Sequence, residues 1–431
     1  MAGEVPKRFK FSIQLAEKGQ PMVNIAILGY GTVGSGVFDV LGQNSETVER
    51  QAGQPVKVKR VFVRRDYPSS EADPYMTRDI DDIMNDGDIR VIVEAMGGLE
   101  SAYAYAKRGL SLRKHIVTSN KELVADYGAE LLALARDNGV NFLFEASVGG
   151  GVPLIAPIVR NLLFDKILYI EGILNGTSNY ILTEMSVGGK GFAEALREAQ
   201  TSGYAESDPA ADVEGLDACR KLSILLSLAS GCRAVWTDIE TQGIARLTEA
   251  DFLCAKSLGY NIKLIAGARL SGSSAEAYVA PRLVPYGHPL YSADGVYNSV
   301  LLGAKAVGNV MFYGRGAGKY PTASAVVSDV IEAARKINEN TGIYWSSETL
   351  DILPPTRAER RMIRAERGEE FEAVAARLWP GAPRVSIKHC QRETAWLTEA
   401  EDSSAVREKL AALEETSPGT RILSAISIIG T

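Results

Sequence analysis

The sequence is poor in the residues that build disulfide frameworks and in the long apolar runs that cross membranes. It contains only four cysteines in 431 residues, and no two of them form a Cys-x-x-Cys pair. This usage indicates reduced thiols rather than a disulfide-bonded secreted protein. No segment approaches the roughly 20 apolar residues of a spanning helix, and residues 1–21 lack the apolar core of a signal peptide. We therefore expect a cytoplasmic protein with no membrane partner.

An excess of positive charge is also missing. Lys and Arg number 47 against 53 Asp and Glu, which gives a formal net charge of -6. This balance provides no electrostatic footprint for nucleic acid, so we expect a small-molecule partner instead. Hydrophobic residues make up 46% and charged residues 23%, as in ordinary soluble proteins, and the length allows two or three domains.

A glycine-rich segment follows the first apolar run. Residues 23–28 are typical of a strand buried on both faces, and the motif Gly29-Tyr30-Gly31-Thr32-Val33-Gly34 comes directly after them. Glycines there permit a tight turn and let backbone amides approach a pyrophosphate at the start of the next helix. The segment predicts a Rossmann dinucleotide-binding domain over residues 22–152, after an extension of residues 1–21. A plain tight loop is the alternative.

The ends of the next two predicted strands indicate where the cofactor lies. The strand over residues 56–63 ends in two arginines, where the NAD fingerprint has a carboxylate for the ribose 2'-hydroxyl. An arginine suits a 2'-phosphate, which favours NADP(H) over NAD(H); the alternative is a solvated basic strand end. The loop 95–98, after a strand over 90–94, is expected beside the nicotinamide because ligands bind at the carboxyl edge of such sheets.

The segment 199–221 concentrates carboxylates and closes with a lysine. Pro209 and the residues after it predict a turn running into a helix, and the chain from Leu216 is apolar at helical spacing. Asp217 and Lys221 stand four residues apart and share a face of that helix. A surface ion pair is the common fate of such a pair. A lysine carried into a partly buried, carboxylate-rich pocket is instead a proton donor whose pKa the site can tune, so we predict a catalytic Lys221.

This segment also resembles a known family. The pattern of Ala199, Gly203-Tyr204, Glu206, Asp208-Pro209, Asp212 and Gly215-x-Asp217-x-x-x-Lys221 is similar to the signature of homoserine dehydrogenase. The resemblance covers roughly residues 22–340 and implies NADP(H)-linked, reversible reduction of L-aspartate 4-semialdehyde to L-homoserine. That reaction belongs to threonine, methionine and isoleucine biosynthesis, and the expected assembly is a homodimer or homotetramer.

The resemblance implies roles for individual residues. Lys121 reaches the active site and assists Lys221, and which of the two donates the proton stays open. The expected substrate-binding residues are Glu206, Asp217, Asp212, Tyr204, Gly176 and Thr177. The expected cofactor contacts are Gly29, Tyr30, Gly31, Thr32, Val33, Gly34, Arg64, Met96, Gly97, Lys121, Gly203 and Gly318. A monovalent cation, usually sodium, is expected on Glu145 and the carbonyls of Val148, Gly150 and Val152, with a metal-free hinge as the alternative.

The fold class we expect is α/β plus α+β. Residues 153–320 predict an α+β substrate and dimerisation domain, with a turn at Asn175-Gly176, and residues 321–345 predict a helix that returns to the nucleotide domain. Residues 357–431 predict a ferredoxin-like βαββαβ unit that resembles a degenerate ACT domain. Its first turn, residues 366–370, lacks the Asp-x-Pro-Gly sequence such domains commonly use to hold an amino acid, so we expect a packing or assembly role.

Three other functions are kept open. A phosphorylating semialdehyde dehydrogenase needs a nucleophilic cysteine, but Cys219 lies in the predicted helix and Cys232 and Cys254 have no nearby histidine. A dehydrogenase acting on another small amino-acid semialdehyde would share the motifs. A catalytically silent dinucleotide-binding sensor would keep the fold without turnover, and an assay with homoserine and NADP+ separates it from the enzyme.

Overall fold

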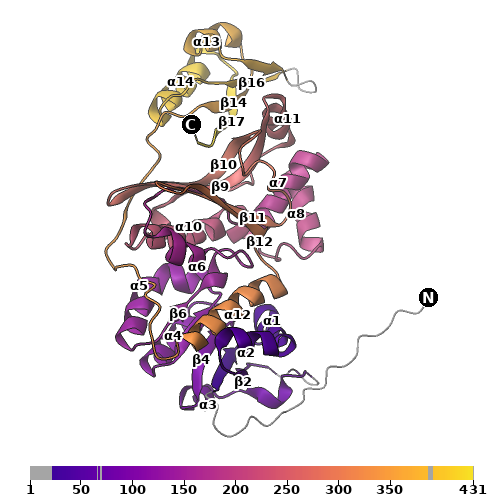
Figure 1. Cartoon of the computed structure of the whole chain (residues 1–431). Helices are drawn as coiled ribbons and strands as arrows, with labels where there is room; N and C mark the ends of the chain where they lie inside the picture. The colour runs from indigo at the N-terminus through magenta and orange to yellow at the C-terminus, as the bar shows by residue number, and fades with distance from the viewer. Residues whose placement is uncertain (1–21, 66, 68–69, 387–391, 431) are drawn as a thin grey trace, which may run out of the picture.

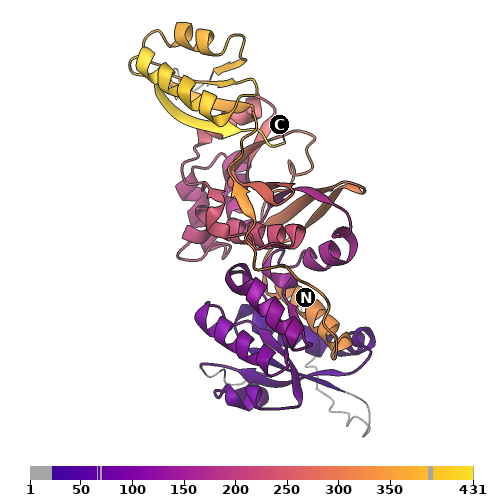
Figure 2. The same cartoon turned by 90° about the vertical axis from the view of Figure 1, so that its left-hand side faces the viewer.

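The computed structural model describes residues 22–65, 67, 70–386 and 392–430. They form three units stacked along one axis, with the N-terminal unit at one end and the C-terminal unit at the other (Figure 1). The view turned by 90° shows the same three tiers (Figure 2). The predicted extension 1–21 lies outside the described residues, and so do residues 387–391 of the predicted βαββαβ unit. None of the described helices combines the length and the apolar character needed to cross a bilayer.

The first unit is built on a parallel sheet of six strands in the order β3-β2-β1-β4-β5-β6. The strands are β1 (Val23–Leu28), β2 (Val56–Phe62), β3 (Met76–Thr77), β4 (Ile89–Glu94), β5 (His115–Thr118) and β6 (Phe142–Leu143). Ile25, Ile27 and Val91 are fully buried, as expected for strands covered on both faces. The strand order reverses between β1 and β4, and this is where such sheets bind nucleotides. The predicted Rossmann architecture is confirmed.

Helices cover both faces of this sheet. One set consists of α3 (Asp81–Met84), α4 (Glu100–Ser111) and α5 (Lys121–Asp137), and the other of α1 (Thr32–Gln43), α2 (Ser45–Ala52) and α12 (Lys319–Arg335). Helix α12 comes from far along the chain, yet its Lys319 Nζ lies 2.8 Å from Asp39 Oδ2 of α1. A Cβ at Gly36 of α1 would stand 2.9 Å from the Lys319 carbonyl oxygen, so the two helices are in close contact.

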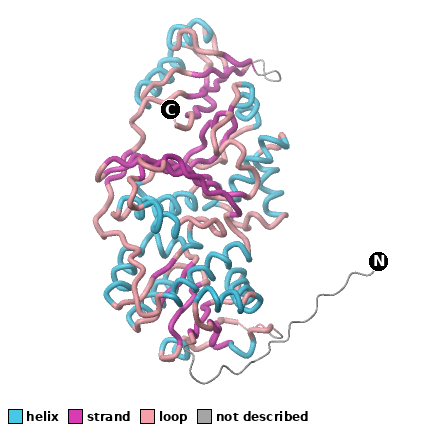
Figure 3. The backbone as a smooth tube through the Cα atoms, in the orientation of Figure 1, coloured by secondary structure: helices cyan, strands magenta, loops and turns pink. Residues whose placement is uncertain are grey.

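The second unit holds a seven-stranded sheet in the order β12-β11-β7-β9-β10-β13, with β8 also paired to β10. Its strands are β7 (Ile167–Ile173), β8 (Glu240–Thr241), β9 (Tyr260–Ser271), β10 (Ser274–Pro285), β11 (Tyr297–Ala304), β12 (Gly308–Arg315) and β13 (Asp351–Leu353). The five long strands pair antiparallel, which confirms the α+β prediction, and β8 and β13 pair with β10 in parallel. Its helices are α7 (Gly176–Gly188), α8 (Phe192–Thr201), α9 (Ala210–Val213), α10 (Leu216–Ser230) and α11 (Glu249–Ser257). Figure 3 shows helix between this sheet and the first unit, where Figure 1 labels α10, while α7, α8 and α11 lie along the side of the sheet.

Two local features of this unit differ from the sequence prediction. The turn predicted at Asn175-Gly176 is the start of helix α7, because the Asn175 side chain accepts a hydrogen bond from Ser178 N at 2.7 Å. Asparagine favours turns and helix N-caps alike, and here the cap is formed. Strand β12 was not predicted; its residues alternate between exposed and half-buried, so it lacks the apolar run of a core strand.

The third unit has the predicted ferredoxin-like order. It consists of β14 (Arg361–Glu366), α13 (Phe371–Leu378), β15 (Arg384–Ser386), β16 (Glu393–Leu397), α14 (Ser403–Thr416) and β17 (Arg421–Ser427). The strands form an antiparallel sheet in the order β15-β16-β14-β17. In the turn after β14, a Cβ at Gly368 would stand 2.3 Å from the Pro418 carbonyl oxygen. The chain itself therefore fills the space beside this turn.

A buried ionic contact fastens the third unit to the second. Asp251 of α11 is fully buried, and its side chain completes a capping box with Thr248. Arg364 of β14 donates from Nε to Asp251 Oδ1 at 2.8 Å and also pairs with Glu393. Helix α11 thus depends on an arginine from another unit for its charge balance.

Replacing Arg364 by methionine is expected to destabilise the protein by about 3–5 kcal/mol, because Asp251 would stay buried without its partner. Denaturant unfolding followed by tryptophan fluorescence measures this loss. Arg421→Met is the matched control: that side chain is 71% exposed and its pair with Glu366 spans 3.5 Å. Equal losses in the two variants would contradict the role given to Arg364.

Candidate active site

Two lysines from different units meet on one carboxylate. Lys121 begins helix α5 of the first unit, and its Nζ lies 2.8 Å from Asp217 Oδ1. Lys221 lies in α10 of the second unit, and its Nζ is 2.7 Å from Asp217 Oδ2. Lys221 also donates to the Leu174 carbonyl at 2.9 Å. The Lys121 and Lys221 side chains are 37% and 12% exposed, so both remain open to a ligand.

Local sequence positions each of these groups. Asn120 is the N-cap of α5, and its Oδ1 accepts from Glu122 N and Leu123 N at 3.1 Å each. Its Nδ2 donates to the Gly98 carbonyl at 2.9 Å, which ties the start of α5 to the loop after β4. Helix α10 begins after Gly215, whose φ of 84° is in the left-handed region that glycine tolerates. Asp217 then lies in the first helical turn, where the helix dipole favours a negative charge.

The buried carboxylate and its two cations stabilise one another. Burial opposes ionisation of Asp217, but Lys221 and Lys121 hold its pKa below the ordinary value. Burial likewise opposes the charge on Lys121, but Asp217 raises the Lys121 pKa above its ordinary value. Two ammonium groups on one carboxylate leave an excess positive charge at the site. Such a charge stabilises an oxyanion that develops beside it.

Asn175 joins the second carboxylate to this cluster. Its Nδ2 donates to Asp212 Oδ1 at 2.6 Å and to Asp217 Oδ2 at 2.8 Å. Burial, together with the charge of Asp217, raises the pKa of Asp212. Asn175 was not among the predicted site residues. The available signal was its place in the predicted turn, directly before Gly176, where an asparagine can also cap a helix.

The other predicted substrate residues lie at the start of α7 and in the loop after α8. Thr177 Oγ1 donates to the Tyr204 carbonyl at 2.8 Å, and Gly176 is the first residue of α7. The Tyr204 side chain is 46% exposed. Glu206 and Gly203 are also exposed, and no described residue forms an ion pair with Glu206. The structure therefore brings Gly176, Thr177 and Tyr204 together, while the Glu206 carboxylate contacts neither lysine.

The first glycine motif leaves room for a phosphate group. Gly29 has a φ of 98°, and a Cβ there would stand 2.6 Å from the Ala95 carbonyl oxygen. A Cβ at Gly34 would stand 2.0 Å from the Gly29 carbonyl oxygen, so these two glycines serve close packing. The space beside Gly31 is open to 4 Å, and α1 has neither a side-chain cap nor an acidic residue in its first turn. Its free amides, which include those of Thr32 and Val33, fit a dinucleotide pyrophosphate.

The remaining predicted cofactor residues lie around this opening. Arg64 is exposed and donates to Ser101 Oγ at 3.0 Å, and the Tyr30 ring packs edge-on against Tyr67. Gly97 has a φ of 75°, and Gly318, the N-cap of α12, has a φ of 120°.

The loop that carries Met96 is held by a buried carboxylate that sequence analysis passed over. Glu94 Oε1 accepts from Met96 N at 2.9 Å, and Thr118 donates to Glu94 Oε2 at 2.6 Å. Burial raises the pKa of Glu94. The only signal in the sequence was a carboxylate closing an otherwise apolar strand.

The Glu145 carboxylate of the predicted cation loop accepts hydrogen bonds from backbone amides of the same chain. Glu145 is buried, and its two oxygens accept from the amides of Leu154, Ile155 and Ala156 at 2.5, 2.8 and 2.7 Å. It thereby caps the short helix α6 (Ile155–Pro157). The Glu145 amide donates to buried Asp329 at 2.8 Å, and burial together with the charge of Glu145 raises the Asp329 pKa well above normal. No group of three or more His, Cys, Asp or Glu side chains within the described ranges has a metal-binding arrangement.

A cation on this loop would therefore take backbone oxygens. Val148 and Val152 are buried, and Gly150 has a φ of 58° with its Cα packed against Gly316. Backbone carbonyls are oxygen donors of the kind that a hard cation takes.

Both the nucleotide unit and the substrate unit that form this site are similar to known proteins. Residues 153–331 match the family model described as homoserine dehydrogenase, and residues 29–145 match the model for the NAD-binding domain of homoserine dehydrogenase. The homoserine dehydrogenase of Synechocystis is 45% identical over 344 residues, which cover 77% of this chain and 76% of that protein. The crystal structure of a homoserine dehydrogenase from Thiobacillus denitrificans has a TM-score of 0.84 at 33% identity and covers 95% of this chain and 99% of its own. A hyperthermophilic archaeal homoserine dehydrogenase in complex with NADPH has a TM-score of 0.63 at 28% identity, with coverage of 73% and 98%. With its paired lysines, its glycine turn and this degree of similarity, the chain belongs to the homoserine dehydrogenase family of oxidoreductases.

Proposed function

We propose that this protein catalyses the NADP(H)-dependent, reversible reduction of L-aspartate 4-semialdehyde to L-homoserine. The observation that carries the proposal is the contact of Lys121 Nζ and Lys221 Nζ with the two oxygens of Asp217. This arrangement puts two proton-bearing cations beside the junction of the nucleotide and substrate units. The reaction would serve threonine, methionine and isoleucine biosynthesis.

The chemistry divides between cofactor and protein. NADPH, when bound, supplies the hydride that reduces the aldehyde carbon. Lys221 is assigned the transfer of a proton to the resulting alkoxide, and Lys121 assists it or orients the substrate oxygen. Asp217 raises the pKa of Lys121 and holds the Nζ atoms of both lysines in place by direct contact. In the oxidative direction the same lysine must lose its proton before it accepts one from homoserine.

The substrate zwitterion needs partners of both signs. Both oxygens of Asp217 already accept hydrogen bonds, so its predicted role in binding the ammonium is the less favoured one. Glu206 is exposed in the loop that also carries Tyr204, and we assign it the ammonium. Asp212 orients Asn175, and the amide of Gly176, the hydroxyl of Thr177 and Tyr204 are assigned to the rest of the substrate.

Three further assignments belong to this proposal. The nucleotide is assigned to residues 22–152, and substrate binding and the dimer or tetramer contact to residues 153–320. The helix that returns to the nucleotide unit is assigned to residues 321–345, and an assembly role to residues 357–431. A sodium ion is assigned to the carbonyls of Glu145, Val148, Gly150 and Val152. The NADP(H) contacts are assigned to the first glycine motif and to Met96, Gly97, Gly203 and Gly318.

One spectrophotometric assay tests the function. L-Homoserine with NADP+ should produce reduced nicotinamide, and the rate with NAD+ should be lower. A protein that binds NADPH but turns over neither homoserine nor any related amino alcohol would be a silent sensor and would reject the proposal. Turnover confined to another amino alcohol would assign a different semialdehyde as substrate.

Arg64 is expected to set the cofactor preference, as the relative that is in complex with NADPH suggests. Arg64→Gln should raise the KM for NADP+ about tenfold or more, because it removes a charge-assisted hydrogen bond to the 2'-phosphate, and should leave the KM for NAD+ nearly unchanged. Initial rates with each nucleotide measure both constants. Arg65→Gln is the neighbouring control, since Arg65 bonds and stacks on Tyr67. If this variant shows the larger loss for NADP+, the contact belongs to Arg65.

A further inference from the structure

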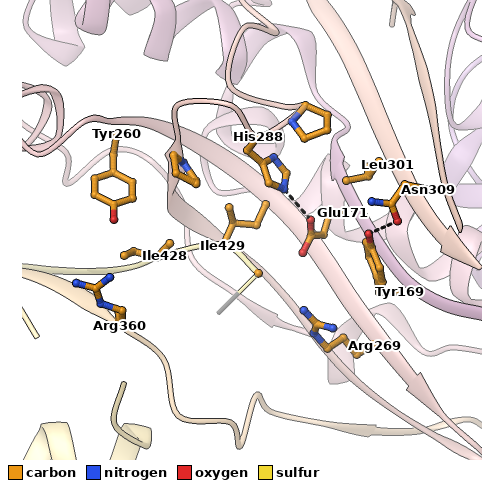
Figure 4. Close-up of a pocket in the computed structure, with 13 residues that line it drawn as sticks. Tyr169, Glu171, Tyr260, Arg269, His288, Leu301, Asn309, Arg360, Ile428 and Ile429 are labelled. Atoms are coloured by element: carbon orange, nitrogen blue, oxygen red, sulfur yellow. Dashed lines mark hydrogen bonds and ion pairs between the residues drawn. The ribbon is translucent and has the colours of Figure 1, made fainter. Parts of the chain in front are cut away.

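A second cavity lies on the face of the seven-stranded sheet that turns away from α10. Its volume is about 490 Å³, and Tyr169, Glu171 and Arg269 line it from the sheet. These residues alternate along β7 and β9 with Ile170 and Ala268, which belong to the core cluster shared with α10. The cavity is therefore separated from the paired lysines by the thickness of the sheet. Its opposite wall is formed by Arg360 and by residues 428–430 of the C-terminal segment (Figure 4).

Two guanidinium groups, one on each wall of this cavity, have no carboxylate partner among the described residues. Arg269 lies over the ring of Tyr169 at 5.5 Å, and Arg360 donates only to the Thr398 carbonyl at 3.4 Å. Glu276 faces Arg269 across the β9–β10 pair, but its carboxylate accepts from Thr356 and lies 4.0 Å from Arg357. Both arginines thus retain unused donors toward the cavity.

The rest of the lining is mostly neutral. Glu171 is the only acidic side chain among the lining residues, and His288 Nε2 lies 3.4 Å from its Oε2. Leu301, Ile429 and Pro289 add apolar surface. In Figure 4, Ile429 lies between the two arginines, so an apolar stretch separates the two cationic ends. Arginine donors favour carboxylate oxygens in a planar, two-bond geometry.

We propose that this cavity binds a small dicarboxylate, with one carboxylate on Arg269 and the other on Arg360 and the carbon chain against Ile429. Such a ligand would contact both the sheet and the C-terminal segment. That segment is already joined to the sheet, because Ile429 N donates to the Leu283 carbonyl at 3.0 Å and Ile428 N to the Arg360 carbonyl at 2.9 Å. A bound dicarboxylate would therefore fasten the third unit onto the second.

Isothermal titration with succinate, without substrate or cofactor, tests the site independently of the proposed catalysis. The wild-type protein should bind succinate saturably at matched ionic strength, and its thermal unfolding midpoint should rise with succinate concentration. Butyrate has the same chain length but only one carboxylate. Its affinity should be lower than that of succinate by about tenfold or more, since one charge-assisted contact is lost. Absence of saturable succinate binding, or equal affinity for butyrate, would overturn the proposal.

Variants locate the binding. Arg269→Gln and Arg360→Gln should each weaken succinate binding about tenfold or more while the protein stays folded by circular dichroism. Arg357→Gln is the control, because Arg357 does not line this cavity. Arg360→Lys keeps a charge but loses the planar fork, and should fall between wild type and Arg360→Gln. Succinate affinity unaffected by both glutamine substitutions would place the anion elsewhere and overturn the assignment.

Discussion

Replacing Lys221 by alanine is expected to lower kcat for aldehyde reduction roughly 10²- to 10⁴-fold, the usual contribution of acid-base catalysis. Lys221 Nζ is fixed by Asp217 Oδ2 and by the Leu174 carbonyl, whereas Lys121 is held on the other oxygen of Asp217, so Lys121 is not expected to replace it fully. The nucleotide opening beside Gly31 is formed by other elements, and NADPH affinity should stay nearly constant. Stopped-flow turnover and NADPH fluorescence titration measure the two quantities separately.

Two further variants make this result specific. Lys256→Ala removes an exposed lysine of α11 and should leave kcat within about twofold of wild type, as surface substitutions usually do. Lys121→Ala decides between the lysines, because the residue whose loss is partly rescued by added methylamine is the proton donor. Full turnover by Lys221→Ala would remove Lys221 from the mechanism. Rescue of Lys121→Ala alone would transfer the donor role to Lys121.

The parts of the site that depend on local sequence were predictable. The strand, the glycine turn and the helix after it could be predicted from the apolar run and the glycines, because each is fixed by contacts within about a dozen residues. The four-residue spacing of Asp217 and Lys221 likewise determines that they share a helix face. The family resemblance supplied Lys121, whose place beside Asp217 no local pattern shows. The ferredoxin-like order of the third unit followed from its alternating strand and helix signals.

The parts that depend on long-range contacts were not predictable. Asn175 lies in a dipeptide that suits a turn or a helix cap equally, and its bonds to Asp212 and Asp217 depend on where α9 and α10 pack. The carboxylate of Glu145 looked like a cation ligand, whereas it caps α6 with both oxygens. Arg364 and Asp251 have no sequence signal at all, because their pairing arises from the docking of two separate units.

The exchange of Asp217 for asparagine is expected to be nearly as damaging as the loss of Lys221, although the residue itself moves no proton. Asparagine keeps the size of the side chain and removes the charge that both ammonium groups contact. The two cations would then repel each other without a counter-charge in a partly buried site. We expect kcat to fall roughly 10²- to 10³-fold, as for removal of one acid-base component, with some loss of stability. Asp212→Asn is the comparison variant, and its loss should be smaller, since Asp212 hydrogen-bonds Asn175 and contributes less to the Lys121 pKa than Asp217 does.

The pH profile separates this role from a merely structural one. Burial lowers the pKa of Lys121, and in the wild-type protein the charge of Asp217 outweighs burial and raises it. Without that charge, burial is opposed only by the smaller contributions of Asp212 and Glu122, so Lys121 should lose its proton at a lower pH than in wild type. Homoserine oxidation needs the lysines of the site in the right protonation state, and Lys121 assists the transfer. Where loss of the Lys121 proton sets the rise of oxidation with pH, that rise should begin at lower pH in Asp217→Asn while the maximum rate stays low. A general loosening of the fold would lower the rate without moving this limb. An unmoved limb in a folded Asp217→Asn protein would show that the influence of Asp217 on Lys121 does not control the reaction, and the shared carboxylate would lose this place in the mechanism.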